Sequence, residues 1–109
     1  WQAAQVCEAF GVQTAWHGPK DTSPVGHVAQ LHLDVASPAF GVQEFSGFSE
    51  AEHALFTGLP ELHEGYLYPG DRPGWGVELN EDAVTQYPPT QGVVGWTQAR
   101  LPDGSLSYP

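Results

Sequence analysis

The stretch Thr14-Ala15-Trp16-His17-Gly18-Pro19-Lys20-Asp21 decides how the rest of the chain is interpreted. It begins as a short apolar strand that ends at a histidine, and Gly18 and Pro19 then turn the chain. Ser23-Pro24 predicts a helix start, because serine favours the N-cap and proline favours the first helical position. Strand ends that lead into a turn and a helix carry functional residues in α/β folds. His17 is therefore a candidate functional residue, although a lone histidine in such a place is more often a surface or capping residue.

Helix and strand patterns alternate around this stretch. A helical spacing of apolar residues over 3–10 precedes a short strand over 12–16, and a second helix is predicted over 24–36. Residues 40–45 then form a nearly continuous apolar strand, as expected for a strand buried on both faces, with the polar Glu44 at its end. This order is typical of parallel strands joined by a crossover helix.

The two predicted strands carry polar residues at corresponding ends, His17 and Glu44. Because the carboxyl ends of parallel strands meet at one edge of a sheet, we expect the two residues on neighbouring strands about 5 Å apart. This placement favours a functional role more than either residue does alone.

The second predicted helix should pack through an apolar face. The residues on that face are Val25, Val28, Ala29, His32 and Val35. We interpret His27 and His32 as structural or solvent-facing residues. The single cysteine, Cys7, cannot form an internal disulfide and is expected to be a small buried hydrophobe.

Beyond residue 46 the chain becomes rich in glycine, proline and short elements. Ser49 and Glu52 have the spacing of a capping box, which predicts a helix over 49–56. Asn80 is expected to cap a second short helix that Pro88-Pro89 ends. The remaining predictions are a hairpin around 66–68, a strand over 77–79, an extended strand over 92–101, a turn over 102–104 and a return over 105–108.

Composition excludes several classes of partner. Lysine and arginine number three against thirteen aspartate and glutamate residues, which gives a formal net charge of −10. Nucleic acids and anionic membrane surfaces need a positive footprint, so we expect neither as a partner. No apolar run approaches the length of a membrane span. The chain opens on Trp1 inside a helical pattern, without a signal peptide, so we expect a cytoplasmic protein whose start is cut from something longer.

The predicted elements do not make a complete fold. Two parallel strands cannot form an independent sheet with both faces covered. Four Trp, five Phe and four Tyr also need more burial partners than these elements supply. We therefore expect the 109 residues to belong to a larger α/β sheet or barrel.

Several blocks of this sequence carry a family resemblance. They are Thr14 to Asp21, Ser23-Pro24-Val25, Leu31-His32-Leu33-Asp34, Pro38 to Glu44, Gly65-Tyr66-Leu67-Tyr68, Asp71 to Val77, Asn80-Glu81-Asp82 and Arg100 to Gly104. Together they resemble the C-terminal end of an enolase-superfamily enzyme of the mandelate racemase/muconate lactonizing type. Within that superfamily the match is to the mannonate dehydratase group, which includes the starvation-sensing RspA-like proteins.

The resemblance implies an α/β fold, a modified TIM barrel with a capping domain, of which this chain forms the C-terminal part. Residues 1–56 would hold the last βα units, with strands ending at His17 and Glu44. Residues 57–109 would be a loop-rich segment that packs on the barrel and the cap. The implied partners are the remainder of the barrel and further copies in a homo-oligomer.

The resemblance also implies a hydro-lyase reaction in sugar-acid metabolism, the dehydration of D-mannonate or D-gluconate. A proton is abstracted next to the carboxylate, an enediolate forms with Mg²⁺ as cofactor, and the β-hydroxyl leaves. The family motif carries His17, Asp21 and Glu44 over as substrate-binding residues. It gives no certain catalytic residue and no metal ligand in this chain, because those groups are expected on strands that the sequence does not contain.

Two other interpretations stay open at this point. The chain could belong to a non-catalytic or regulatory enolase-like protein with weak or no dehydratase activity. It could also be a free-standing acidic binding module, although its unsupported strands argue against that. Metal carboxylates and an acid/base pair on upstream strands would distinguish the dehydratase from both.

Overall fold

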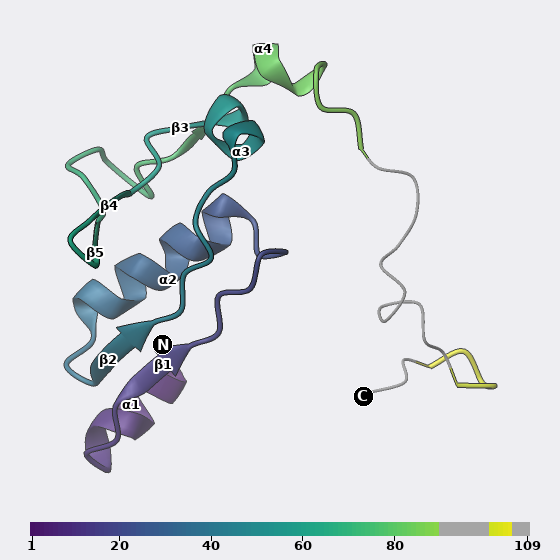
Figure 1. The fold of residues 1–109 in the computed structure, drawn as a ribbon. Coiled ribbons are helices and arrows are strands. Elements are labelled where there is room, and N and C mark those ends of the chain that lie inside the picture. Colours follow the sequence, from purple (N-terminus) through teal and green to yellow (C-terminus); the bar gives the residue numbers. More distant parts are fainter. Residues whose placement is uncertain (90–100, 106–109) are drawn as a thin grey trace.

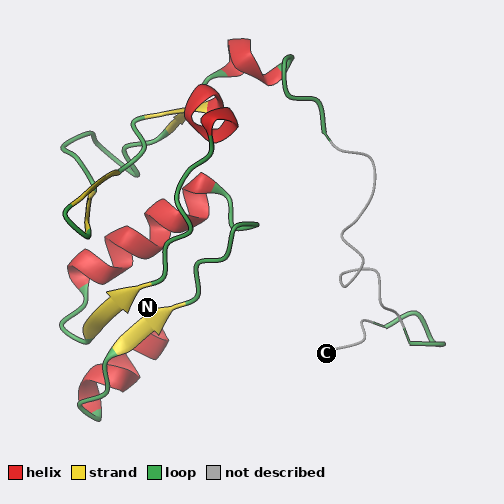
Figure 2. Cartoon of the chain, viewed as in Figure 1, coloured by secondary structure: helices red, strands yellow, loops and turns green. Residues whose placement is uncertain are grey.

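Helices and short strands alternate up to residue 55, as the sequence predicts, and four short strands then precede the last helix (Figures 1 and 2). The computed structural model describes residues 1–89 and 101–105. Its helices are α1 (Gln2–Ala9), α2 (Pro24–Ala36), α3 (Glu50–Leu55) and α4 (Glu81–Val84). Its strands are β1 (Thr14–Trp16), β2 (Phe40–Gln43), β3 (Phe56–Thr57), β4 (Glu61–His63), β5 (Tyr66–Tyr68) and β6 (Glu78–Leu79).

The strands β1 and β2 pair in parallel, which confirms the predicted crossover unit. They lie side by side in Figure 1, with the connecting helix α2 alongside. Trp16 pairs with Gln43 at the carboxyl end of both strands. The next backbone N–H, that of Glu44, still donates to the Trp16 carbonyl at 3.3 Å. The ends of β1 and β2 are therefore held together up to Glu44.

The helix α2 begins as predicted but packs through a face that only partly matches the predicted one. Ser23 Oγ accepts a hydrogen bond from the Gly26 N–H at 3.3 Å, and Pro24 is the first helical residue. The predicted face is correct for Val28, which is 1% exposed, but wrong for Val25 and Val35, which are 43% and 69% exposed. The buried residues are instead Pro24, His27, Val28, Leu31 and Asp34. Two of these buried side chains, His27 and Asp34, are polar, so apolar spacing alone did not identify the full packed face.

Much of the apolar surface near the parallel strands is exposed. Val42 of β2 is 61% exposed and Phe10 beyond α1 is 80% exposed. Cys7 is half-buried rather than buried. The prediction that β2 is buried on both faces therefore does not hold within this chain. The physical reason is that β2 has one neighbouring strand, and the described residues do not cover the rest of its surface.

The second half of the chain contains the predicted capping box and hairpin. The Ser49 N–H donates to Glu52 Oε2 at 2.7 Å, and the Glu52 N–H donates to Ser49 Oγ at 3.3 Å.

Strands β4 and β5 form an antiparallel hairpin, and β3 pairs with β6. The hairpin turns at Glu64 and Gly65, which both have positive φ, as a two-residue type I′ turn requires.

The last helix begins after Asn80, which stands at its N-cap position as predicted, but two details of its ends differ from the prediction. The Asn80 side chain does not cap α4; its amide donates to the Ala54 carbonyl at 3.1 Å and so ties α4 to α3. The helix ends at Val84, before Pro88-Pro89, because the backbone continues in turns, with the Gln86 N–H donating to the Ala83 carbonyl and the Tyr87 N–H to the Val84 carbonyl. The predicted turn over 102–104 is confirmed, with the Gly104 N–H donating to the Leu101 carbonyl at 2.8 Å.

Two further predicted elements, the strand over 92–101 and the return over 105–108, fall almost entirely outside the described residues. Within the described helices, none has the length and apolar character needed to cross a membrane.

Candidate functional site

The carboxyl ends of β1 and β2 bring His17 and Glu44 together. His17 Nε2 lies 3.7 Å from Glu44 Oε2, and the two side chains are 79% and 58% exposed. Both groups therefore project from a rigid strand end towards open space. The predicted proximity of the two residues is confirmed.

Gly18 is the backbone element that positions the Glu44 carboxylate. Its N–H donates to Glu44 Oε2 at 3.0 Å. A Cβ atom built on Gly18 would lie 2.1 Å from the Glu44 carbonyl oxygen and 3.0 Å from His27 Cε1. Only glycine allows the chain after β1 to approach the end of β2 this closely.

Two glutamine side chains tie the site to α2 and were not foreseen from the sequence. Gln30 Nε2 donates to the His17 carbonyl at 2.8 Å, and Gln43 Nε2 donates to the His27 carbonyl at 3.3 Å. The placement of His17 thus depends on α2 as well as on β1. A glutamine on the helix that follows a strand is only a weak sequence signal that its side chain will bind the backbone at the end of that strand.

His27 is a buried residue of α2 that lies next to Gly18. The ring is 3% exposed and packs edge-on against Phe45 and Phe48, with centroids 5.4 and 6.0 Å away. Neither ring nitrogen has a hydrogen-bond partner among the described residues. The interpretation of His27 as a structural residue is consistent with this burial.

Asp21 lies in the exposed turn between β1 and α2. The turn is closed by the Thr22 N–H, which donates to the Pro19 carbonyl at 3.0 Å. No hydrogen bond or ion pair joins Asp21 to His17 or Glu44. The structure therefore places Asp21 in the loop that follows the pair but does not bring its carboxylate into contact with them.

A buried polar pair lies between α2 and β1, away from His17 and Glu44. Asp34 is 4% exposed, and burial raises the pKa of its carboxyl to about 6, with the nearby Trp16 indole opposing the rise. The indole Nε1 and both carboxylate oxygens lack a well-formed hydrogen bond to a described residue. Asp34 was missed because an acidic residue in a helix is ordinarily solvent-facing.

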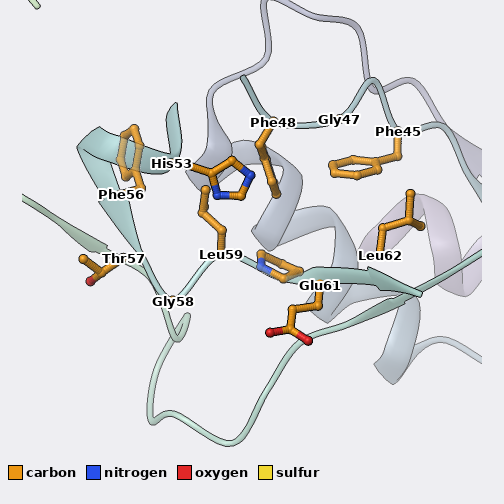
Figure 3. Close-up of a pocket in the computed structure, with 11 residues that line it drawn as sticks. Phe45, Gly47, Phe48, His53, Phe56, Thr57, Gly58, Leu59, Glu61 and Leu62 are labelled. Carbon is orange, nitrogen blue, oxygen red and sulfur yellow. The ribbon is translucent and has the colours of Figure 1, made fainter. Parts of the chain in front are cut away.

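An aromatic cavity of about 770 Å³ lies beyond the site (Figure 3). Phe48 packs edge-on between Phe45 and His53, at centroid distances of 4.9 and 6.0 Å. Glu61 of β4 also lines this cavity, but His17, Asp21 and Glu44 do not. The cavity is therefore distinct from the pair at the strand ends.

The sequence of this chain matches a known protein family. A family model described as enolase C-terminal domain-like matches residues 1–83. The chain belongs to this family. The predicted fold class, the C-terminal part of an enolase-type α/β barrel, is confirmed by this match and by the solved structures of the family.

Relatives within the enolase superfamily are named D-galactonate dehydratase family members. One from Enterocloster bolteae is 50% identical over 106 residues, which are 97% of this chain and 26% of the relative. Another from Pantoea ananatis, named RspA, is 45% identical over 102 residues, 94% of this chain and 24% of the relative. The chain thus spans about a quarter of the length of these relatives.

Solved structures of the superfamily show the same arrangement. The crystal structure of an enolase from Pantoea ananatis with bound D-gluconate and Mg is 44% identical, with a TM-score of 0.82 over 99% of this chain and 26% of that chain. A putative L-alanine-DL-glutamate epimerase from Burkholderia xenovorans, bound to magnesium and fumarate, is 26% identical with a TM-score of 0.71 over 83% of this chain.

The described residues offer few ligands for a metal ion of the enolase type. Among them, no three or more His, Cys, Asp or Glu side chains gather in a way that could hold a metal ion. His17 and Glu44 supply one imidazole and one carboxylate, which is fewer than the several oxygen ligands that Mg²⁺ takes. His17 and Glu44 therefore do not form a Mg²⁺ site by themselves.

Proposed function

We propose that this chain forms the last barrel strands of a sugar-acid dehydratase of the enolase superfamily. The observation that carries the proposal is the His17–Glu44 pair, which stands exposed at the adjoining carboxyl ends of two parallel strands. Ligands of α/β barrels bind at that end of the strands. The names of the relatives and the D-gluconate in the Pantoea ananatis structure support the same class of substrate.

Within this proposal His17, Asp21 and Glu44 bind the hydroxyl groups of the sugar acid. Glu44 Oε2 already accepts the Gly18 N–H, which leaves Oε1 to accept a substrate hydroxyl. His17 Nε2 can donate or accept, depending on its tautomer. Asp21, in the loop between them and α2, would add a second carboxylate acceptor from the open side.

The proposed reaction removes the proton next to the substrate carboxylate and releases the β-hydroxyl as water. We assign neither step to a residue of this chain; the acid/base groups and the Mg²⁺ ligands are proposed to lie on other strands of the barrel. The residues described here contribute binding and orientation. D-Gluconate is the preferred candidate substrate, because the solved relative binds it, and D-mannonate is the second, because of the motif resemblance.

The remaining proposals concern the arrangement of the chain. Residues 1–56 supply the two barrel strands, and residues 57–109 pack on the barrel and the capping domain. The exposed apolar side chains of β2 and α1, such as Val42 and Val6, support a covering by the rest of the barrel. We further propose a cytoplasmic homo-oligomer.

The test is an assay of the full-length protein that carries this chain. We expect Mg²⁺-dependent conversion of D-gluconate, D-mannonate or D-galactonate to the 2-keto-3-deoxy acid, lost on chelation and restored by Mg²⁺. His17→Asn should lower kcat/KM at least tenfold, because it removes a ring that reaches the substrate. His63→Asn, on the exposed hairpin, is the matched control and should leave kcat/KM unchanged. Absence of turnover with all three acids would instead favour a non-catalytic enolase-like protein.

A further inference from the structure

His27 contacts the residues on both sides of Glu44. Phe45, which follows Glu44, packs edge-on against the His27 ring at a centroid distance of 5.4 Å. Gln43, which precedes Glu44, donates its side-chain amide to the His27 carbonyl at 3.3 Å. The segment that carries Glu44 is therefore attached to one residue of α2 at two points, one on either side of the carboxylate.

The same ring also meets the segment that leaves β1. Its Cε1 atom lies 3.0 Å from the position that a Cβ on Gly18 would take, and Gly18 directly follows His17. The Gly18 N–H in turn donates to Glu44 Oε2 at 3.0 Å. The His27 ring thus lies against the residue whose backbone holds the Glu44 carboxylate.

His27 is itself held firmly. It lies in the first turn of α2, where its N–H donates to the Ser23 carbonyl at 3.1 Å. The residue is 3% exposed, and the adjoining Val28 is 1% exposed. The ring can therefore move only if α2 moves with it, which makes it a fixed reference for both strand ends.

We propose that His27 is a positioning residue whose ring sets the separation between Gly18 and Phe45 and so aligns His17 with Glu44 for substrate binding. This inference rests on the proposed function. The ring acts through its shape, because neither ring nitrogen has a hydrogen-bond partner among the described residues. His27 is buried beneath the exposed pair and touches no reacting atom.

His27→Ala should loosen the alignment of the pair. Without the ring, the Gly18 amide should exchange its hydrogen faster relative to the amides of α2, because its bond to Glu44 loses support. A misplacement of about 1 Å can cost roughly 100-fold in rate, so we expect kcat/KM of the full-length protein for D-gluconate to fall at least about tenfold. Most of this loss should be a rise in KM, because His17 and Glu44 are proposed to bind the substrate.

Val28→Ala is the matched control for a merely structural effect. Val28 adjoins His27 on α2 and is equally buried, but it is not among the atoms nearest to the Gly18 Cβ position. The substitution should lower the melting temperature, because it leaves a cavity in the core. It should leave KM and the relative exchange of the Gly18 amide unchanged. Equal changes of both quantities in the two variants would overturn the proposal.

His27→Phe tests whether the ring acts through its shape. Phenylalanine fills a similar space and removes two buried nitrogen atoms that lack partners, so the melting temperature should stay the same or rise. KM and the exchange of the Gly18 amide should return to the values of the unmodified protein. If His27→Phe were as impaired as His27→Ala, the role of the ring as a spacer would be refuted.

Hydrogen exchange separates this proposal from the proposed activity, because it needs no turnover. Faster relative exchange of the Gly18 amide in His27→Ala, but not in Val28→Ala or His27→Phe, supports the positioning role even if the protein converts no sugar acid. Unchanged relative exchange in His27→Ala overturns that role even if the protein is an active dehydratase.

Discussion

The Gly18 N–H and the Glu44 carboxylate are joined by a 3.0 Å hydrogen bond that spans the ends of β1 and β2. The same glycine leaves no room for a side chain, because the Glu44 carbonyl lies where a Cβ would be. The backbone after one strand therefore sets both the position of the next strand and the direction of its terminal carboxylate. This relationship makes Gly18 the most sensitive position of the candidate site.

Gly18→Ala should damage stability and binding together. The added methyl group would have to displace the Glu44 backbone, which we expect to lower the free energy of unfolding by about 1–3 kcal/mol. Misplacement of the Glu44 carboxylate should also raise KM for the sugar acid. Urea unfolding and steady-state kinetics measure the two effects.

Gly70→Ala is the comparison for that substitution. Gly70 has a φ of 72° and open space around its Cβ position, so alanine there costs only the left-handed backbone conformation. We expect about 1 kcal/mol of destabilisation and an unchanged KM. If Gly18→Ala behaved no differently from Gly70→Ala, the close approach to Glu44 would not matter for function.

Gln30→Ala should affect the site through the backbone of His17. The change removes the 2.8 Å hydrogen bond to the His17 carbonyl, worth about 1 kcal/mol in the free energy of unfolding. We expect kcat/KM to fall severalfold, while Gln30→Glu, which cannot donate that bond, falls at least as far. Gln5→Ala, on the exposed surface of α1, is the control and should leave kcat/KM unchanged. Normal kinetics in Gln30→Ala would show that β1 alone positions His17.

Asp34 should make stability depend on pH in an unusual direction. Its folded-state pKa of about 6 lies above the ordinary value of 3.8, so the folded protein holds a proton that the unfolded chain releases. The contribution of Asp34 to the free energy of unfolding is therefore fully present below about pH 4 and is lost as the pH rises through 6. Asp34→Asn should remove this loss and raise the free energy of unfolding by about 3 kcal/mol at neutral pH, since one pKa unit corresponds to about 1.4 kcal/mol. Urea titrations between about pH 4 and pH 8 measure the slope.

The exposed Asp71 supplies the control for that series, because Asp71→Asn changes the same charge at the surface. We expect it to leave the pH dependence as it is. A neutral-pH loss of stability in Asp34→Asn would contradict the prediction and would indicate that the carboxylate is paired with a cation in the full-length protein.

Ser49→Ala should weaken the start of α3. The serine hydroxyl accepts the Glu52 N–H at 3.3 Å and donates to Glu52 Oε2 at 2.7 Å. Loss of this N-cap should cost about 1 kcal/mol, and Ser49→Asp should restore most of it, because aspartate also caps helices. Thermal unfolding of the two variants gives the comparison; equal melting temperatures for Ser49→Ala and the unmodified protein would rule out a stabilising cap.

The parallel strands and their polar ends were predictable because local chemistry encodes them. Ser23 and Pro24 mark the start of α2, and the apolar run before Glu44 marks β2. Parallel pairing then follows from the crossover order, which brings His17 beside Glu44. The capping box of α3 is likewise a short-range pattern, with Ser49 and Glu52 three residues apart.

The unpredicted features depend on contacts between distant parts of the chain. Gln30 reaches back thirteen residues to the His17 carbonyl, and the Asn80 amide turns to Ala54 instead of capping its own helix. Asp34 is buried because α2 turns the face with Val28 and Asp34, rather than Val25 and Val35, towards the strands. A single sequence contains the residue types for these contacts but not the geometry that selects among them.

The paired strands β1 and β2 leave two rows of backbone hydrogen-bonding groups without partners in the described residues, one along each outer edge. Such edges recruit strands from other molecules, and the apolar side chains beside them, such as Val42, strengthen that tendency. A polypeptide limited to these 109 residues would therefore be prone to self-association during expression and purification. Measurements of binding or stability made on it would report aggregation as much as the properties of the site.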